Sequence, residues 1–378
     1  MKEIIKEIKP VAEKVFAHLH AHPEISWQEV GTTRYLKELL EAEGIRVETF
    51  DDSTGLVAVI GEGKPCVGLR TDIDALWQEV DGEYRANHSC GHDAHMTLAV
   101  GALLALKKQG IPKKGCLKVL FQPAEEKGTG ALSFIEKGLV DDIDYLYGVH
   151  LRPSQEVEDG YATPAIMHGS AKMIGGKILG TDAHGARPHE GQNAIEVMAL
   201  LVQAIHSIHV DPMVPHSAKV TMFQAGGESA NIIPGTAVFS MDIRAQTNEV
   251  MDKLFEQVKK AITSVADLTG VKIPIEIKAE IAAAEVDDTA VAIMSRAIEE
   301  TLGKAFLKPP VVTPGGEDFH FYTLKRPSVK ASMLGLGCGL SPGLHHPQMS
   351  FNQESLIGGI EILARAVQYT FEQSERGE

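Results

Sequence analysis

CVGLRTDIDAL, residues 66–76, is the stretch of sequence that decides the fold. Its apolar run begins just after Pro65 and gives way to Asp72 and Asp74. A short apolar run between Gly and Pro residues is typical of a strand. We therefore predict a strand here, with the two aspartates at its carboxyl end.

Strands and helices alternate on both sides of this stretch. Further strands are predicted at 55–61, 116–126 and 144–153, and helices at 3–20, 31–43, 93–108 and 131–140. The same rhythm resumes late in the chain, with helices at 288–303 and 353–374 and a strand at 329–337. This alternation favours a doubly wound α/β sheet.

The middle of the chain has a different order of elements. Strands are predicted at 171–180, 217–225, 236–244 and 271–282, and helices at 192–209 and 247–268. The resulting βαββαβ order is that of the split, ferredoxin-like unit. We therefore predict a discontinuous α/β domain, residues 1–168 and 284–378, that carries an inserted domain at 169–283.

Composition excludes several classes of function. The 378 residues carry a net charge of −15 and no dense Lys/Arg patch, which argues against a nucleic-acid-binding face. No run reaches the roughly 18 apolar residues that span a bilayer. The N-terminus lacks the apolar core of a signal peptide, so the expected compartment is the cytoplasm. The four scattered cysteines are expected to be free thiols.

Polar residues gather where the predicted strands end. Asp72 and Asp74 end one strand, Glu125 and Glu126 follow the next, and His150 follows a third. Open α/β sheets bind ligands at the carboxyl ends of their strands. We therefore expect these side chains to share a single crevice.

The motif HSCGHDAH, residues 88–95, opens the helix that follows the first of these strands. Cys and His are donors for Zn, Mn, Co or Ni, and a Gly turn would direct Cys90 and His92 into one site. The motif lacks the second ligand pair of a structural zinc site. His88, Asp93 and His95 remain open between supporting the ligands and packing in the core.

FQPAEE, residues 121–126, places two adjacent carboxylates at a strand end. One can bind a metal while its neighbour acts as general base on a water. Taken alone, Glu125 and Glu126 fit a solvated loop, and His150 or His345 fits a buried core histidine. Together with Cys90 they supply enough donors for two metals about 3.5–4 Å apart.

These motifs resemble those of the M20 family of metallo-aminoacylases and carboxypeptidases. The resemblance runs essentially end to end. It is closest to the amidohydrolase branch with hippurate hydrolases, indole-acetyl-amino-acid hydrolases and N-acetyl-diaminopimelate deacetylases. The motifs that carry it are LHAHPEISWQE (19–29), RTDIDAL (70–76), HSCGHDAH (88–95), FQPAEE (121–126), GVHLRP (148–153), HGARPHEGQNAI (184–195), NIIPG (231–235), GGEDF (315–319) and LHHP (344–347).

The resemblance implies five ligands for two divalent metal ions. Cys90 would be shared, and the paired ligands would be Glu126 with His345 and His92 with His150. Glu125 would be the general base. Manganese is the expected metal, and zinc, cobalt or nickel could replace it.

The resemblance also implies that the inserted domain is a lid that often forms a homodimer. His184 would help to hold the oxyanion, sometimes from the partner subunit. Asn231 and Arg244 would face the substrate, and Gly315 and Gly316 would line the pocket. For Arg244, pairing with a surface acid is an equally good interpretation.

The resemblance implies hydrolysis of the amide bond of an N-acyl, typically N-acetyl, amino acid. A dipeptidase or carboxypeptidase would use the same metal residues, and a binding or sensor protein on this scaffold is a third alternative. One departure bears on the substrate. Only 11 residues separate Leu76 from His88, in a segment that is longer in the family and lies near the substrate entrance.

Overall fold

The computed structural model describes residues 1–376, which form two compact units. Unit 1 comprises Met1–Met167, Glu285–Val312 and the chain from Asp318 onward. Unit 2 comprises His168–Ala284 and Thr313–Glu317. Each unit has its own apolar core. No helix in the described part of the chain combines the length and the apolar character needed to cross a bilayer.

Unit 1 is built on a seven-stranded sheet with the order β1-β2-β6-β3-β7-β17-β8. The strands are β1 (Arg46–Thr49), β2 (Leu56–Glu62), β3 (Cys66–Asp72), β6 (Gly115–Gln122), β7 (Tyr145–Pro153), β8 (Ala162–Thr163) and β17 (Lys330–Leu340). The four central strands, β6, β3, β7 and β17, are parallel. Antiparallel strands flank them, so the sheet is mixed.

The order of the parallel strands reverses at β3. From β3 the chain passes to β6 on one side and later to β7 on the other. At such a reversal the connections leave in opposite directions and open a crevice beyond the carboxyl ends of the strands. Asp72, Gln122 and His150 belong to these three strands, so the crevice is expected where the sequence places its polar residues.

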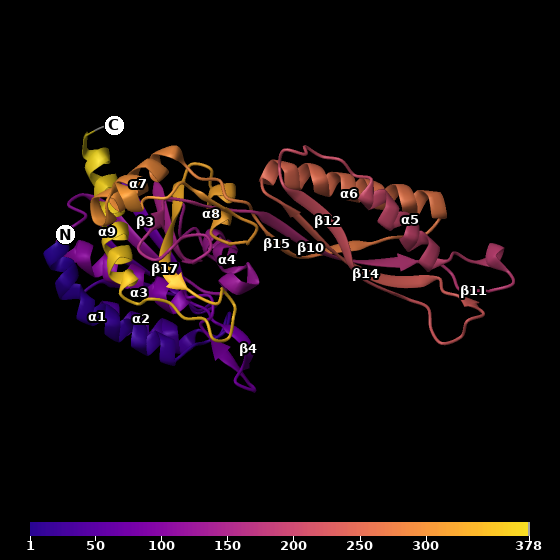
Figure 1. Ribbon diagram of the computed structural model, residues 1–378, viewed down its shortest axis with the longest axis horizontal. Helices are drawn as coiled ribbons and strands as arrows, with labels where there is room; N and C mark the ends of the chain where they lie inside the picture. Colours follow the sequence, from indigo (N-terminus) through magenta and orange to yellow (C-terminus); the bar gives the residue numbers. More distant parts are fainter. Residues whose placement is uncertain (377–378) are drawn as a thin grey trace. The chain divides into compact units, whose positions relative to one another are not determined.

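Helices cover this sheet. They are α1 (Lys2–Ala21), α2 (Val30–Ala42), α3 (His92–Lys108), α4 (Gly130–Glu136), α7 (Asp288–Leu302), α8 (His320–Lys325) and α9 (Ser355–Arg376). Helix α3 is buried continuously from His92 to Leu106, because it packs against β3 and also between α1 and α9 (Figure 1). A helix that is apolar all round requires such an environment.

The remaining short elements lie in unit 1 or where the chain passes between the units. β4 (Leu76–Val80) and β5 (Glu83–Asn87) form a hairpin, and β9 (Ile166–His168) pairs with β16 (Val311–Thr313). Single 3₁₀ turns occur at Glu125–Lys127 and Lys304–Phe306.

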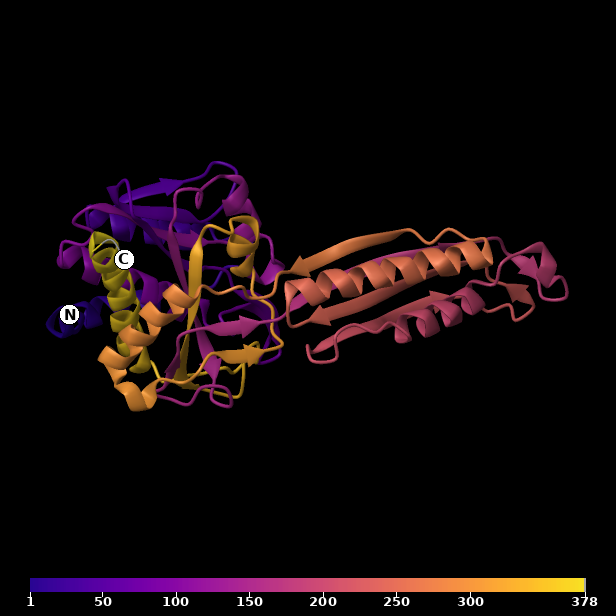
Figure 2. The same ribbon diagram turned by 90° about the horizontal axis from the view of Figure 1, so that it is seen from above.

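Unit 2 contains a four-stranded antiparallel sheet with the order β12-β14-β10-β15. Its elements are β10 (Ser170–Leu179), β11 (Ala183–His184), a 3₁₀ turn (Pro188–Glu190), α5 (Ala194–His206), β12 (His216–Ala225), β13 (Ile232–Ile233), β14 (Thr236–Ala245), α6 (Asn248–Thr269) and β15 (Ile275–Ile281). Helices α5 and α6 lie along one face of the sheet (Figure 2). Along β14, Phe239, Met241 and Ile243 are buried on this face, and the residues between them lie on the open face.

The predicted α/β class is confirmed, and each of the long helices and strands predicted from the sequence is present within a few residues. Strand β3 ends at Asp72 and not at Leu76. The β4–β5 hairpin that follows was not predicted, because Trp77, Glu79 and Tyr84 are exposed and interrupt the apolar pattern.

Candidate metal centre

Cys90 lies at the middle of a cluster of side chains in unit 1. Its sulfur is 3.6 Å from Nε2 of His150 and 3.3 Å from Nε2 of His345. Oε1 of Glu126 lies 3.5 Å from Nε2 of His345 and 3.8 Å from Nε2 of His92. The donor atoms form two close groups that share the sulfur, one with His92 and His150 and the other with Glu126 and His345. The five residues predicted as ligands are therefore brought together.

A glycine turn directs Cys90 and His92 into this cluster. Gly91 is the N-terminal cap of α3 and has a φ of 87°, which side chains rarely allow. A Cβ atom there would also lie 3.1 Å from Leu151. The spacing of the motif thus reflects a turn that only glycine fits well.

Backbone carbonyls fix the orientation of two of the histidines. Nδ1 of His92 donates to the carbonyl of Asp74 at 2.8 Å, and Nδ1 of His150 donates to that of Leu151 at 2.7 Å. With Nδ1 protonated, Nε2 is left as the electron-pair donor that faces the cluster. This arrangement is the usual support of a metal-bound histidine.

Asp74 holds the two predicted glutamates in place. Its carboxylate accepts hydrogen bonds from the backbone N–H groups of Glu125 and Glu126, each at 3.1 Å, and from the hydroxyl of Ser26. Ala124 has a φ of 52° and turns the chain sharply after β6. Glu125 and Glu126 form one further close group with His92, so the predicted base is beside the predicted ligands.

His345 reaches the cluster from a loop. Its φ is 64°, and its side chain is 55% exposed, whereas Cys90, His92 and His150 are buried. Its backbone N–H donates to the carbonyl of Ser89 at 2.7 Å. This bond ties the loop directly to the Cys90 motif, 255 residues earlier in the sequence.

The sequence left the roles of His88, Asp93 and His95 open. His95 lies close to His92 and Asp72, and His95 and Asp93 are each engaged with side chains other than the five predicted ligands. Both ring nitrogens of His95 are engaged, one with Asp72 at 2.8 Å and one with the N–H of Leu151 at 3.0 Å. Asp93 binds Nδ1 of His20 at 2.6 Å and so joins the end of α1 to the start of α3. His88 is buried, and burial lowers its pKa to about 4.

The cluster has the character of a cation site. Among the described residues, none hydrogen-bonds to Nε2 of His92 or Oε1 of Glu126, although both atoms are buried. Burial raises the pKa of Glu126 to about 7, and burial together with Glu126 raises the pKa of the Cys90 thiol. Buried donors and acids of this kind are stabilised by bound metal, and mixed Cys, His and carboxylate donors suit divalent transition metals.

A buried ionic network supports the centre and was not identified as such from the sequence. The guanidinium of Arg70 donates to Asp72 at 2.8 Å, to Asp318 at 2.6 Å and to Gln122 at 2.8 Å. Asp72 in turn binds His95. An aspartate at a strand end can also simply form a turn. The sequence alone therefore did not show that Asp72 supports the centre.

The predicted lid residues divide between the two ends of the sheet in unit 2. His184 pairs with Ile232, and Gly185 donates to the carbonyl of Asn231 at 2.7 Å, so His184 and Asn231 are neighbours. They follow the end of the sheet where Leu179 pairs with Thr236. Nδ1 of His184 accepts the N–H of Ala186 at 3.0 Å, which leaves Nε2 as a hydrogen-bond donor.

Arg244, Gly315 and Gly316 lie at the other end of that sheet. Arg244 pairs with Ala171, which is eight residues along β10 from Leu179, or roughly 26 Å at about 3.3 Å per residue. Gly315 accepts a hydrogen bond from Gly169 at this end. The guanidinium of Arg244 binds Asp242 at 2.9 Å, which is the pairing that the sequence left as an alternative.

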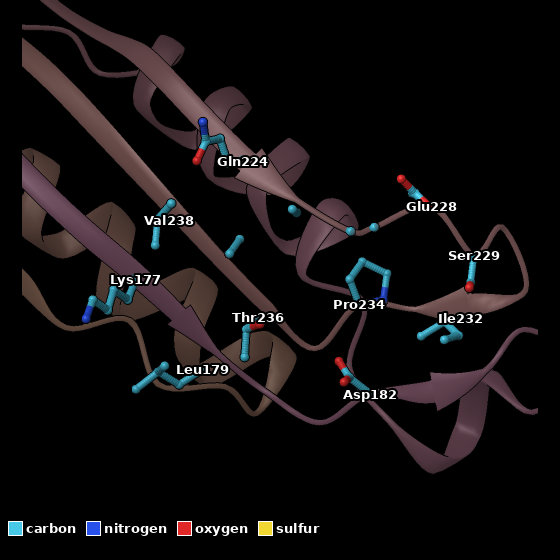
Figure 3. A pocket seen from close by; sticks show the side chains of 14 residues that line it. Lys177, Leu179, Asp182, Gln224, Glu228, Ser229, Ile232, Pro234, Thr236 and Val238 are labelled. Carbon is cyan, nitrogen blue, oxygen red and sulfur yellow. The ribbon is translucent and has the colours of Figure 1, made fainter.

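A pocket of about 560 Å³ lies beside the His184 end of unit 2 (Figure 3). Lys177, Gln224 and Val238 line it from the strands, and Glu228 and Ile232 from the loop around Asn231. None of the five predicted metal ligands lines it.

Residues 68–369 match the model of peptidase family M20/M25/M40. The chain is 31% identical to N-acetyl-L-cysteine deacetylase of Bacillus subtilis, covering 95% of this chain and 88% of that protein. It is 30% identical to hippurate hydrolase of Campylobacter jejuni, covering 97% and 96%.

A solved structure shows the same fold over nearly the whole chain. It is the YXEP protein of Bacillus subtilis, described as a dinuclear metal-binding peptidase of the M20 family. The TM-score is 0.81 at 24% identity, with 97% of this chain and 99% of the other covered. The fold, the cluster around Cys90 and the sequence similarity agree. This chain therefore belongs to peptidase family M20/M25/M40 and is a metal-dependent amidohydrolase.

Proposed function

We propose that the protein hydrolyses the amide bond of N-acyl amino acids, with N-acetyl amino acids as the expected substrates. The observation that carries this proposal is the pair of donor groups that share Cys90, with Glu125 beside them. The names of two relatives, N-acetyl-L-cysteine deacetylase and hippurate hydrolase, support the choice of substrate class. Which acyl group and which amino acid are cleaved is a question for a substrate panel.

We propose that Cys90 is shared by two divalent ions, with Glu126 and His345 completing one site and His92 and His150 the other. Bound there, the ions would lower the pKa of water and polarise the scissile carbonyl. Manganese is the proposed metal, and zinc, cobalt or nickel are alternatives that the same donors accommodate.

Glu125 is the proposed general base. It belongs to the close group with His92 and Glu126, and its backbone is fixed by Asp74. Its carboxylate accepts a proton from the attacking water and then delivers that proton to the leaving nitrogen. The proposed metal ligand, Glu126, and the proposed base, Glu125, need side chains that point in different directions. Adjacent residues in a chain can provide this.

Unit 2 is the proposed ferredoxin-like lid and dimerisation unit. In chain order its main strands are arranged 2-3-1-4, as in ferredoxin-like sheets, with both helices on one face. His184 is proposed to donate from Nε2 to the oxyanion, a role that its tautomer suits. Asn231, Arg244, Gly315 and Gly316 are the proposed substrate contacts.

The two ends of unit 2 bear on this assignment. His184 and Asn231 lie at one end, and Arg244 and the glycines lie at the other, roughly 26 Å along the sheet. A single small substrate does not span that distance. We therefore propose that one group serves the subunit's own centre and that His184 serves the centre of a partner subunit.

A peptidase acting on dipeptides or C-terminal residues is the second candidate function. It is favoured by the description of the solved relative as a peptidase. Assays with N-acetyl amino acids, hippurate and dipeptides under manganese would separate the candidates. Hydrolysis of dipeptides at rates well above those of every N-acyl amino acid would select the peptidase.

The test of the mechanism is Glu125→Gln. The variant should bind as many metal ions per chain as the wild type, two by this proposal, and lose on the order of 10²–10⁴-fold in kcat. Metal content is measured by elemental analysis and kcat by amino-acid release. An unchanged kcat would exclude Glu125 as the base, and a wild-type protein that binds no divalent metal would exclude the dinuclear site.

A further inference from the structure

The β4–β5 hairpin connects the strand that ends near Asp74 to the Cys90 motif. Its turn residues, Asp81 and Gly82, have φ values of 54° and 85°. Positive φ at both positions is typical of a type I′ turn, which joins antiparallel strands without a bulge. The register then places Leu76 opposite Asn87 and Gln78 opposite Arg85. Gln78 and Asn87 consequently share one face of the hairpin.

That face hydrogen-bonds to the loop that carries His345. The amide of Gln78 donates to the carbonyl of His345 at 3.0 Å. Asn87 donates to Oε1 of Gln78 at 3.0 Å and to the carbonyl of Pro347 at 3.0 Å. The two side-chain amides thus hydrogen-bond to each other, and each also binds one carbonyl of the loop, that of His345 or that of Pro347.

His345 needs such support more than the other proposed ligands do. His92 belongs to a buried helix and His150 to a central strand, whereas His345 is half exposed and lies in a loop. Its φ of 64° is a left-handed conformation that costs a residue with a side chain on the order of 1 kcal/mol or more. A conformation of this kind persists only when contacts from outside hold it.

The contacts on either side of His345 come from the same stretch of chain. Ser89 accepts its N–H, and Gln78 donates to its carbonyl. Both peptide groups of His345 are therefore held by residues 78–89, the segment that directly precedes Cys90. The short connection between Leu76 and His88 therefore helps to hold the loop that carries His345.

We propose that Gln78 and Asn87 are positioning residues that hold His345 against Cys90 and Glu126, and so set the metal affinity of that one site. The inference rests on the proposed function, because it takes His345 as a ligand. The site with His92 and His150 has supports elsewhere, in Asp74 and Leu151, and does not depend on the hairpin.

The test is a titration of the metal-free protein with Mn²⁺. Binding is measured by calorimetry and by electron paramagnetic resonance. Gln78→Met and Asn87→Leu keep side-chain bulk and remove the amides. In each variant only one of the two Mn²⁺ sites, the one with His345, should lose affinity. The expected loss is about 10–100-fold, the range for residues that orient ligands. The signal of paired Mn²⁺ should then appear only at higher Mn²⁺ concentration.

Glu79→Gln is the matched control, since Glu79 is the next residue on the same strand and points to the opposite face. It should titrate as the wild type does. Thermal unfolding of the metal-free variants checks that the fold is retained, and Asn87→Leu gives an independent reading if Gln78→Met unfolds.

Each outcome is decisive. Wild-type affinity at both sites in the folded Gln78→Met and Asn87→Leu variants would overturn the inference, as would an equal loss at both sites. If the wild-type protein itself bound no Mn²⁺ or other divalent ion, the proposed function would fail, and this result is distinct from a failure of the hairpin inference alone.

Discussion

At the scale of single residues, Cys90 is the one donor common to both groups of proposed ligands. His92 and His150 form one close group with its sulfur, and Glu126 and His345 form the other. A thiolate in this place would offer one atom to both proposed metals, whereas a carboxylate would offer two oxygens. The loss of Cys90 should therefore affect both sites, and the loss of His150 or His345 only one.

Cys90→Ala should accordingly weaken both sites together. We expect metal content to fall well below one ion per chain at metal concentrations that saturate the wild type, and His345→Ala to retain one. Cys338→Ala is the control, because Cys338 is also a buried thiol but is not a proposed ligand. Elemental analysis after dialysis measures the stoichiometry. A Cys90→Ala protein that retains one tightly held ion would show that the thiol is not shared.

The residues that the sequence identified and those that it missed differ in what they contact. Cys90, His92 and Glu126 stand in dense runs of donor side chains, which a reader of the sequence can find. Gln78 and Asn87 act on backbone groups of distant residues. Such bonds leave no pattern in the sequence, because any residue offers the same N–H or carbonyl.

At the scale of elements, α3 shows how tightly the ligands are supported. The helix that begins at His92 packs against α9, and both helices have glycine at the contact. A Cβ atom on Gly101 would lie 2.5 Å from Cδ1 and 2.8 Å from Cγ1 of Ile360. The glycine is thus needed for close approach, although glycine is a poor helix former.

Gly101→Ala should therefore destabilise the protein. The substitution gains about 1 kcal/mol of helix propensity, but overpacking costs about 1–3 kcal/mol. We expect a net loss of up to about 2 kcal/mol in the free energy of unfolding, measured by denaturant titration. In an Ile360→Ala background the same change should become stabilising, because the clash is gone. Equal effects in both backgrounds would contradict the packing argument.

Gly358→Ala in α9 is the matched control. There a new Cβ atom would meet only Leu302, at the ordinary distance of 3.4 Å. Stability should stay the same or rise by up to about 1 kcal/mol.

Elements were predictable where their patterns were long. Helices α1, α3 and α6 and strands β3, β6 and β14 have periodic or continuous apolar runs, and the sequence places them within a few residues. The β4–β5 hairpin has five residues in each strand and exposes Trp77 and Tyr84. Its strands are defined by hydrogen bonds to each other and to the His345 loop, so local pattern could not reveal them.

At the scale of the whole molecule, the chain leaves unit 1 after Met167 and returns after unit 2 to complete it. Strand β17 joins the sheet beside β7, and His345 follows that strand. The alternation of elements predicted this return, because the α/β pattern resumes after the insertion. It does not predict which subunit's centre the proposed contact from His184 would serve, since that depends on assembly.

Mixing two inactive variants tests the proposed assignment of His184 to a partner subunit. In a heterodimer of Glu125→Gln and His184→Ala chains, the second chain has an intact base and receives His184 from the first. One of the two centres of the heterodimer, that of the His184→Ala chain, is then complete. Random reassociation of equal amounts should restore about a quarter of the wild-type rate, because half of the dimers are mixed and each has one complete centre.

The control mixes Glu125→Gln with Cys90→Ala, whose lesions both lie in unit 1. Neither centre of that heterodimer is complete, so no activity should return. Chain mass in solution, measured by light scattering, establishes that dimers form. Restored activity in the first mixture alone follows only if His184 acts across the dimer. If neither mixture recovers although heterodimers are present, His184 acts within its own subunit.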